Sequence, residues 1–182
     1  FLAKMEIHLK KELDGLTKKI YKLAGSEFNI ASPAQIKKVL FEDLEISVSG
    51  IKKTKTGFST NAAQLEKLKG VHPIIALIVD FRELNKLQST YVTALPWLIN
   101  KKTKRIHTNF NQTVTATGRL SSSNPNLQNI PIRTELGKKI REAFVAPQGY
   151  TLLSADYSQI ELRLVAALSN DPKMLTSFKK GE

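Results

Sequence analysis

Apolar residues recur every three or four positions along the first part of the chain, which predicts a long amphipathic helix that ends near Gly25. The apolar side of this helix is formed by Leu2, Met5, Leu9, Leu13, Leu16, Ile20 and Leu23. A second long helix is expected to begin at Pro73, with a buried side formed by Ile74, Leu77, Ile78, Phe81, Leu84 and Tyr91. Between them, Ser32 followed by Pro33 predicts the start of a short helix, and Thr60 is expected to cap another.

The helical periodicity gives way near Leu95 to alternating polar and β-branched residues, which are typical of strands. Strand-like stretches are expected at residues 104–120, as two short strands or a hairpin, and at residues 140–147 and 150–156. Pro125 and Pro131 exclude a regular helix through the turn-rich segment that contains them. Trp97 and the phenylalanines are expected in the core, and His107 is interpreted as structural because no second ligand lies at a suitable spacing.

Residues 158–169 follow the pattern of a buried helix, and a last helix is expected to begin at Asp171 and Pro172. These elements predict the α+β class. A helical part covers residues 1–94, and residues 95–182 form a mixed part whose antiparallel sheet is incomplete.

Composition narrows the class of protein further. A chain of 182 residues with 41% hydrophobic residues fits a globular protein. The absence of cysteine excludes disulfides, thiolate catalysis and cysteine-ligated zinc. The longest apolar run, residues 74–79, is far shorter than the roughly 20 residues that cross a bilayer, so no membrane partner is expected.

The net charge of +12 is concentrated in the middle of the chain. Residues 51–150 carry 16 lysines and arginines against 5 acidic residues, and no acidic residue lies between Glu83 and Glu135. Arg82, Lys86, Ser89 or Thr90, and Thr93 also follow a helical spacing. Although a basic surface is often only solvated, this acid-free stretch favours a polyanionic partner.

Two carboxylates interrupt an otherwise apolar stretch near the end of the chain. Ser158 and Glu161 have the spacing of a capping box, and Asp156 could simply cap the turn before the helix. Alternatively, Asp156 could present oxygen to a hard cation, because Mg²⁺ binds one or two carboxylates together with phosphate oxygens and water.

Several motifs favour the second interpretation. "DYSQIELR", residues 156–163, closely resembles the first palm motif of the family A, bacterial polymerase I-like DNA polymerases. "TATGRLSSSNPNLQNIPIRT", residues 115–134, resembles the segment just upstream of that motif. "AGSEFNIASPAQIKKVLF", "KTGFST" and "FRELNKLQSTY" resemble the thumb of the same family, in the family's order. The chain is therefore identified as a member that covers the helical thumb and the first part of the palm of a right-hand polymerase.

The resemblance implies template-directed DNA synthesis by two-metal nucleotidyl transfer, in replication or repair. Asp156 would bind both Mg²⁺ ions, and the main-chain carbonyl of Tyr157 would complete one shell. Glu161 would lie against the sugar of the incoming deoxynucleoside triphosphate and exclude a ribose 2′-hydroxyl. Ser158 and Gln159 would belong to the same nucleotide-binding segment.

The resemblance also implies contacts with primer–template DNA. Arg119, Gln128, Asn129 and Arg133 would lie along the minor groove. The acceptors there are nearly the same for every base pair, which suits an enzyme that copies any template. Arg82, Lys86 and Thr90 would contact the duplex backbone.

A second catalytic carboxylate and a fingers helix, which this family needs, are not found in these residues. The chain is therefore expected to be inactive alone, to require the rest of the polymerase and to act in the bacterial cytoplasm. A non-catalytic primer–template binding module remains an alternative. A single-subunit RNA polymerase is disfavoured by Glu161, and a nuclease is disfavoured because residues 84–134 contain no carboxylate.

Overall fold

The computed structural model describes residues 1–55, 57–132 and 134–181, and these form two compact units. The first unit is Phe1–Phe144 and the second is Val145–Glu182. Helices and two small antiparallel sheets occur together, which confirms the predicted α+β class. The functional division expected after residue 94 remains a prediction.

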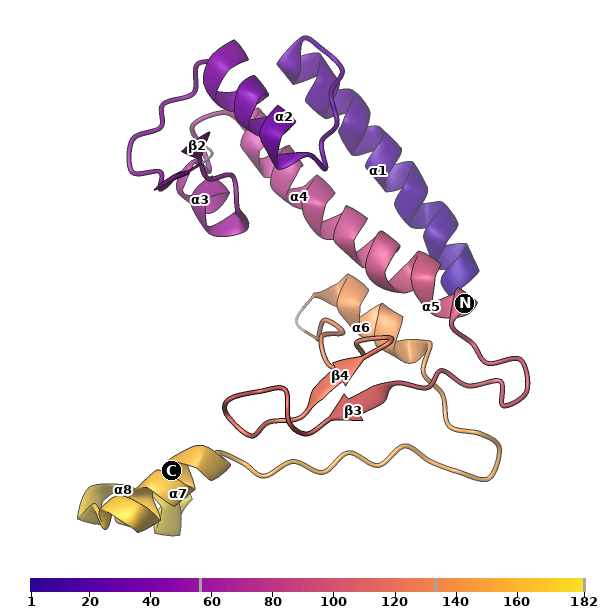
Figure 1. The fold of residues 1–182 in the computed structure, drawn as a ribbon, viewed down its shortest axis with the longest axis vertical. Helices are drawn as coiled ribbons and strands as arrows, with labels where there is room; N and C mark the ends of the chain where they lie inside the picture. The colour runs from indigo at the N-terminus through magenta and orange to yellow at the C-terminus, as the bar shows by residue number, and fades with distance from the viewer. Residues whose placement is uncertain (56, 133, 182) are drawn as a thin grey trace. The chain divides into compact units, whose positions relative to one another are not determined.

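Two long helices, α1 (Leu2–Ala24) and α4 (Pro73–Leu87), lie side by side and antiparallel in the first unit (Figure 1). The predicted apolar side of α1 is confirmed, because Leu9, Leu13 and Ile20 are buried. The helix ends where Gly25 adopts a left-handed conformation with φ of 72°, which glycine takes without steric strain. At its own end, α4 continues into η2 (Gln88–Thr93), a π-helix, and α5 (Ala94–Trp97).

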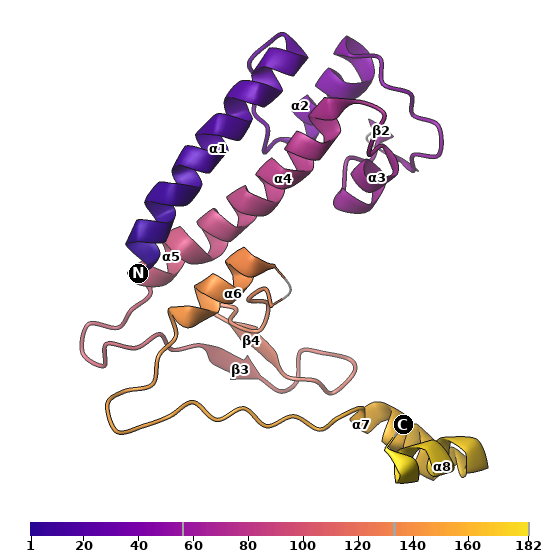
Figure 2. The ribbon, with the colours of Figure 1, turned by 180° about the vertical axis from the view of Figure 1, so that it is seen from behind.

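Short elements pack near the start of α4 (Figure 2): α2 (Pro33–Lys38), η1 (Val39–Asp43), β1 (Lys53–Thr54), β2 (Gly57–Phe58) and α3 (Ala62–Lys67). Ser32 caps α2 as predicted. The prediction that Thr60 caps α3 is wrong. Asn61 is the cap, because its side-chain oxygen accepts a hydrogen bond from the Gln64 amide at 2.9 Å. Thr60 is buried instead and accepts a hydrogen bond from Arg82.

Two clusters of buried apolar residues stabilise the first unit. The first lies between the early part of α4 and the short elements, and includes Ile20, Ile36, Leu40, Leu65, Ile74 and Ile78. The second lies where the chain returns to the start of α1, and consists of Leu9, Leu87, Tyr91, Val92, Leu95 and Ile140. The second cluster joins residues from both ends of the first unit, so it fixes the later segments against α1 and η2.

The first unit also contains an antiparallel hairpin and a helix. Strand β3 (Asn109–Asn111) pairs with β4 (Ser121–Ser123), so the hairpin is confirmed, although its second strand begins one residue after the predicted stretch. The strand predicted from residue 140 is wrong, because α6 (Glu135–Glu142) covers its first residues. Thr134 caps α6, and the buried residues Gly137 and Ile140 are three positions apart, which places them on the same side of the helix.

The second unit consists of an irregular segment, residues 145–159, followed by α7 (Ile160–Ser169) and α8 (Pro172–Lys180). The last helix begins at Pro172 as predicted, and the side chain of Asp171 caps it by accepting a hydrogen bond from the Met174 amide. The strand expected at residues 150–156 does not form within the described chain, where no other segment offers it hydrogen bonds. The helix expected at residues 158–169 forms, but its predicted burial is wrong, since Leu168 is 87% exposed and Ala166 is the only buried α7 residue described.

The expectation that Trp97 lies in the core is also wrong. Its side chain is 86% exposed, and Phe110 is 68% exposed. Within the described residues, no helix is long and apolar enough to cross a bilayer.

Candidate nucleic-acid interface

Three of the predicted DNA-binding residues lie around one hollow of about 410 Å³ in the first unit. Lys86 and Thr90 come from successive turns of α4 and η2, and Asn129 comes from the segment between β4 and α6. This central hollow is also lined by Glu83, Leu87, Tyr91, Asn126, Pro131 and Thr134. A lysine, a hydroxyl and an amide around an open concavity provide hydrogen-bond donors for phosphate, sugar or base-edge acceptors.

The position of Asn129 is fixed by a tyrosine that the sequence interpretation assigned only to the core. The hydroxyl of Tyr91 donates a hydrogen bond to the main-chain carbonyl of Asn129 at 2.5 Å. Burial raises the pKa of Tyr91, so the phenol keeps its proton and remains a donor. The contact spans 38 positions of sequence, and no local pattern could have predicted it.

A second hollow, of about 580 Å³, lies next to the first and shares Asn129 with it. Gln128 and Arg141 also line it. Sequence reasoning missed Arg141 because residues 140–147 were expected to form a strand, whereas Arg141 lies beside the buried Ile140 in α6 (Glu135–Glu142). Arg133, the cation that was predicted to lie near Gln128 and Asn129, is outside the described residues.

A buried hydroxyl organises the segment that leads to Gln128 and Asn129. The Ser122 hydroxyl is 2.7 Å from the Thr108 hydroxyl and accepts a hydrogen bond from the Leu127 amide at 3.0 Å. Thr108 also donates to the carbonyl of Pro125 at 2.7 Å. These hydrogen bonds give partners to the Pro125 carbonyl and the Leu127 amide. The side chain of Leu127 packs against the second buried cluster.

Arg119 lies at the end of the β3–β4 loop and lines neither hollow. The Thr115 hydroxyl donates a hydrogen bond to the carbonyl of Arg119 and closes the turn around Gly118, where φ is 73°. The structure therefore gives Arg119 an ordered backbone but does not group it with Lys86, Thr90 and Asn129.

The predicted stripe of phosphate donors along α4 and η2 is only partly available to a ligand. Arg82 donates hydrogen bonds to Thr60, and Thr93 donates to the carboxylate of Glu6 at 2.8 Å. Arg82 also lines a separate hollow of about 760 Å³ together with Lys37, so it has a basic neighbour that sequence reasoning missed. Lys86, Ser89 and Thr90 are the exposed members of the stripe.

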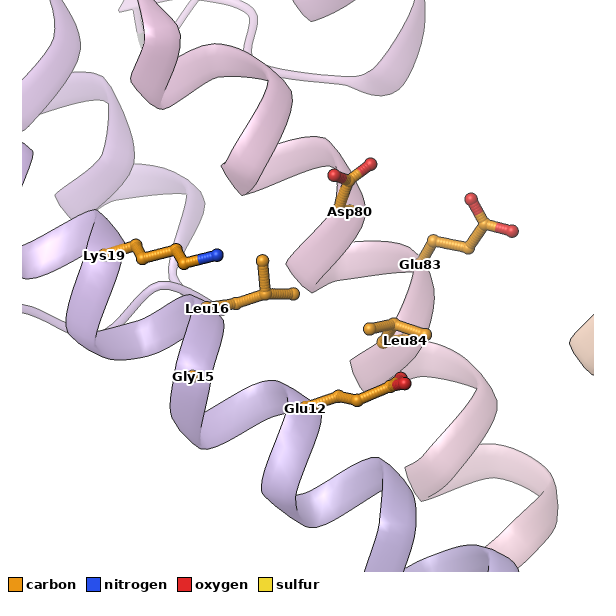
Figure 3. A pocket seen from close by; sticks show the side chains of 7 residues that line it. All are labelled: Glu12, Gly15, Leu16, Lys19, Asp80, Glu83 and Leu84. Carbon is orange, nitrogen blue, oxygen red and sulfur yellow. The ribbon is translucent and has the colours of Figure 1, made fainter.

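An acidic hollow of about 530 Å³ lies between α1 and α4 (Figure 3). Its lining includes three carboxylates and one cation, Lys19, together with the apolar Leu16 and Leu84; the carboxylates belong to Glu12, Asp80 and Glu83. Three carboxylates around one opening repel phosphate at close range. The central hollow is therefore a better candidate for a DNA contact than this acidic hollow.

The residues of the palm-like motif lie in the second unit. Asp156, Tyr157, Ser158 and Gln159 are exposed and precede α7, and Glu161 lies in the first turn of that helix. The capping-box interpretation is wrong: Gln159 is the N-cap, with φ of 54°, and its side chain makes no capping hydrogen bond. The carbonyl of Ser158 instead accepts a hydrogen bond from Arg163 at 2.8 Å.

The donor set of this segment suits magnesium by type. A carboxylate at Asp156 and a main-chain carbonyl at Tyr157 are hard oxygen ligands of the kind that Mg²⁺ prefers. Across the described residues, no three histidine, cysteine or acidic side chains are grouped so as to hold a metal ion. These donors alone therefore do not make a closed site, and further ligands would have to come from substrate, water or other protein residues.

Comparisons with known proteins agree with the motifs. The family model described as DNA polymerase family A matches residues 1–182. The chain is 52% identical to the thermostable DNA polymerase I of Thermus filiformis over its whole length, and 52% identical to the DNA polymerase I of Synechocystis over 98% of its length. It spans only 22% and 18% of those two proteins.

A solved structure is similar over the entire chain. It is the POL domain of Pol1 from M. smegmatis in complex with a DNA primer–template and dNTP, with a TM-score of 0.89 and 42% sequence identity. The chain covers 32% of that protein.

Proposed function

Because this chain belongs to DNA polymerase family A, we propose that it forms the thumb, residues 1–94, and the first part of the palm, residues 95–182, of an enzyme that copies DNA from a primer–template. The proposal concerns a longer protein, since the chain spans about a fifth of the relatives' length. That protein would work in the bacterial cytoplasm and supply the fingers and the remaining palm.

The observation that carries the proposal is the meeting of Lys86, Thr90 and Asn129 at the central hollow. In this role Lys86 and Thr90 contact backbone phosphates, while Asn129 and Gln128 donate to minor-groove acceptors. Arg82, Arg119 and Arg133 would extend these contacts to neighbouring phosphates and sugars. Such contacts hold a duplex of any sequence, as a copying enzyme requires.

In the second unit, Asp156 would bind two Mg²⁺ ions, the carbonyl of Tyr157 would complete the shell of one of them, and the remaining ligands would come from substrate, water and the rest of the longer protein. Bound Mg²⁺ would neutralise the phosphate charges and activate the attacking oxygen. Glu161 would pack against the sugar of a deoxynucleoside triphosphate and reject a ribose, because the extra hydroxyl would clash with the carboxylate and lose its water. Ser158 and Gln159 would line the same nucleotide site.

Binding of a fluorescent primer–template duplex to the 182-residue chain tests the DNA contact. Lys86→Ala should weaken binding several-fold. The slope of the logarithm of the binding constant against the logarithm of the salt concentration should become shallower by about 1, as expected for the loss of one phosphate contact. Lys18→Ala, which removes an exposed charge from α1, is the matched control. If the two substitutions weakened binding equally, Lys86 would contribute only through the overall positive charge of the chain and not through a specific DNA contact.

Primer extension tests the catalytic part. We expect no Mg²⁺-dependent nucleotide addition by the 182-residue chain, and addition by the longer protein that Asp156→Ala abolishes. Activity of the longer protein that is unchanged in Asp156→Ala would instead support the non-catalytic binding module.

A further inference from the structure

The end of α5 and the two residues after it expose three apolar side chains in a row. Trp97, the only tryptophan of the chain, is 86% exposed, Leu98 is 46% exposed and Ile99 is 44% exposed. Tryptophan is largely buried in most proteins, so a nearly bare indole is an informative feature. Main-chain hydrogen bonds from Leu98 to Leu95 and from Ile99 to Pro96 give this stretch an ordered backbone.

A basic turn, residues 100–105, follows immediately. The Asn100 amide donates to the Arg105 carbonyl at 2.9 Å, and the Lys104 amide donates to the Asn100 carbonyl at 2.8 Å. The Asn100 side chain also accepts from the amides of Lys102 and Thr103 at 2.9 and 3.1 Å. The turn is thus preorganised, which lowers the entropy cost of binding a ligand.

The turn presents a concentrated positive charge. Lys101, Lys102, Lys104 and Arg105 are all exposed. The sequence offers them no acidic neighbour, because none lies between Glu83 and Glu135. A cluster of cations beside a bare aromatic ring complements a ligand that is both anionic and planar.

A hollow connects this surface with the candidate DNA interface. It has a volume of about 580 Å³ and is lined by Leu98 at one side and by residues 122–126 at the other. Asn126 lines both this hollow and the central hollow that holds Lys86 and Asn129. A strand leaving the duplex at the central hollow would therefore pass Asn126 and reach Leu98, the residue next to Trp97 in sequence.

We propose that Trp97 and the basic turn form a binding site for single-stranded DNA. The cations of the turn bind backbone phosphates, and the indole of Trp97 stacks on an unpaired base. A single strand is preferred over a duplex because the bases of a duplex are already stacked on one another. The site lies beyond the contacts proposed for the primer–template, and its failure would leave those contacts untouched.

Trp97 is itself the reporter for the test. Titration of the 182-residue chain with a short oligothymidylate should quench the tryptophan fluorescence, and anisotropy of a labelled oligothymidylate gives the affinity. Trp97→Ala should weaken this binding by roughly tenfold, which is typical for the loss of one stacking contact between an aromatic side chain and a base. Trp97→Phe keeps an aromatic ring and should retain most of the affinity. The side chain is exposed in the native protein, so folding should not change in either variant.

The charge contribution has a matched control on α1. Alanine should replace the four cations of the turn together: Lys101, Lys102, Lys104 and Arg105. This change should weaken oligothymidylate binding more than tenfold. The slope of the logarithm of the binding constant against the logarithm of the salt concentration should become shallower by about 0.7 for each phosphate that is no longer bound. Replacement of the exposed Lys4, Lys10, Lys11 and Lys18 removes the same charge from α1 and should have a much smaller effect. Lys86→Ala should weaken duplex binding but leave oligothymidylate binding nearly unchanged.

Three outcomes would overturn the proposal. The first is an affinity that Trp97→Ala leaves unchanged. The second is inorganic polyphosphate binding as tightly as the oligothymidylate, which would make the turn a general anion surface. The third is that, without DNA, Trp97 becomes less accessible to a soluble fluorescence quencher as the protein concentration rises. This result would assign the surface to contact with a second copy of the chain.

Discussion

At the scale of single residues, Tyr91 connects the thumb-like helices to the segment that carries Asn129. Its hydroxyl donates to the Asn129 carbonyl, and its ring belongs to the second buried cluster. Tyr91→Phe keeps the ring and removes the hydrogen bond, so the free energy of unfolding should fall by about 1 kcal/mol. Because the segment loses its tether, affinity for a primer–template duplex should also fall several-fold, as measured by anisotropy.

Tyr21 provides the control for this prediction. Its hydroxyl donates to the carbonyl of Phe28 at 2.8 Å in a half-buried setting near the other end of α1. Tyr21→Phe should lower stability by a similar amount in urea denaturation and leave duplex affinity as it was. If both tyrosine variants weakened DNA binding equally, Tyr91 would have only a structural role.

At the scale of elements, α6 and the segment before it approach so closely that only glycine fits between them. A Cβ atom on Gly137 would lie 2.6 Å from the Cβ of Pro131 and 2.8 Å from its carbonyl oxygen. Gly137→Ala should therefore force backbone movement and lower the free energy of unfolding by about 1–3 kcal/mol. Gly15→Ala in α1, where nothing lies within 4 Å, should instead raise it by about 0.5–1 kcal/mol. Thermal or urea unfolding compares the two, and equal signs would contradict the close approach.

The sequence predicted elements best where a local signal decides the structure. The helix end at Gly25, the cap at Ser32 and the helix start at Asp171 and Pro172 depend on neighbouring residues only, and all three predictions are confirmed. The β-branched and aromatic residues of residues 140–147 predict a strand, but the cap at Thr134 and the burial of Ile140 favour a helix over Glu135–Glu142.

The candidate site was harder to predict than the elements. Motif resemblance selected Lys86, Thr90 and Asn129, and the structure brings them together, but it also engages Arg82 with Thr60. Such contacts join residues far apart in sequence, so neither periodicity nor propensity reveals them.

At the scale of the whole molecule, the two units differ in how much apolar surface they bury. The first unit contains both buried clusters, whereas Ala166 is the only buried residue described in the second. We therefore expect a cooperative unfolding transition from the first unit alone. Ile20→Ala should lower its free energy of unfolding by about 2–5 kcal/mol, and Leu168→Ala, at an 87% exposed position, should change it little.

Hydrogen exchange separates the units directly, and it links stability to function. Amides of α1 and α4 should exchange slowly, while those of α7 should exchange nearly as fast as in an unfolded peptide, because local opening there exposes almost no new apolar surface. Asp156 precedes this weakly held helix and Glu161 lies in its first turn, so the proposed metal and sugar contacts would not be preorganised in the 182-residue chain. In a longer protein that covers the apolar side of α7, exchange there should slow at the same time as primer extension is gained. Slow exchange of α7 in the isolated chain without activity would mean that missing ligands, rather than missing rigidity, prevent catalysis.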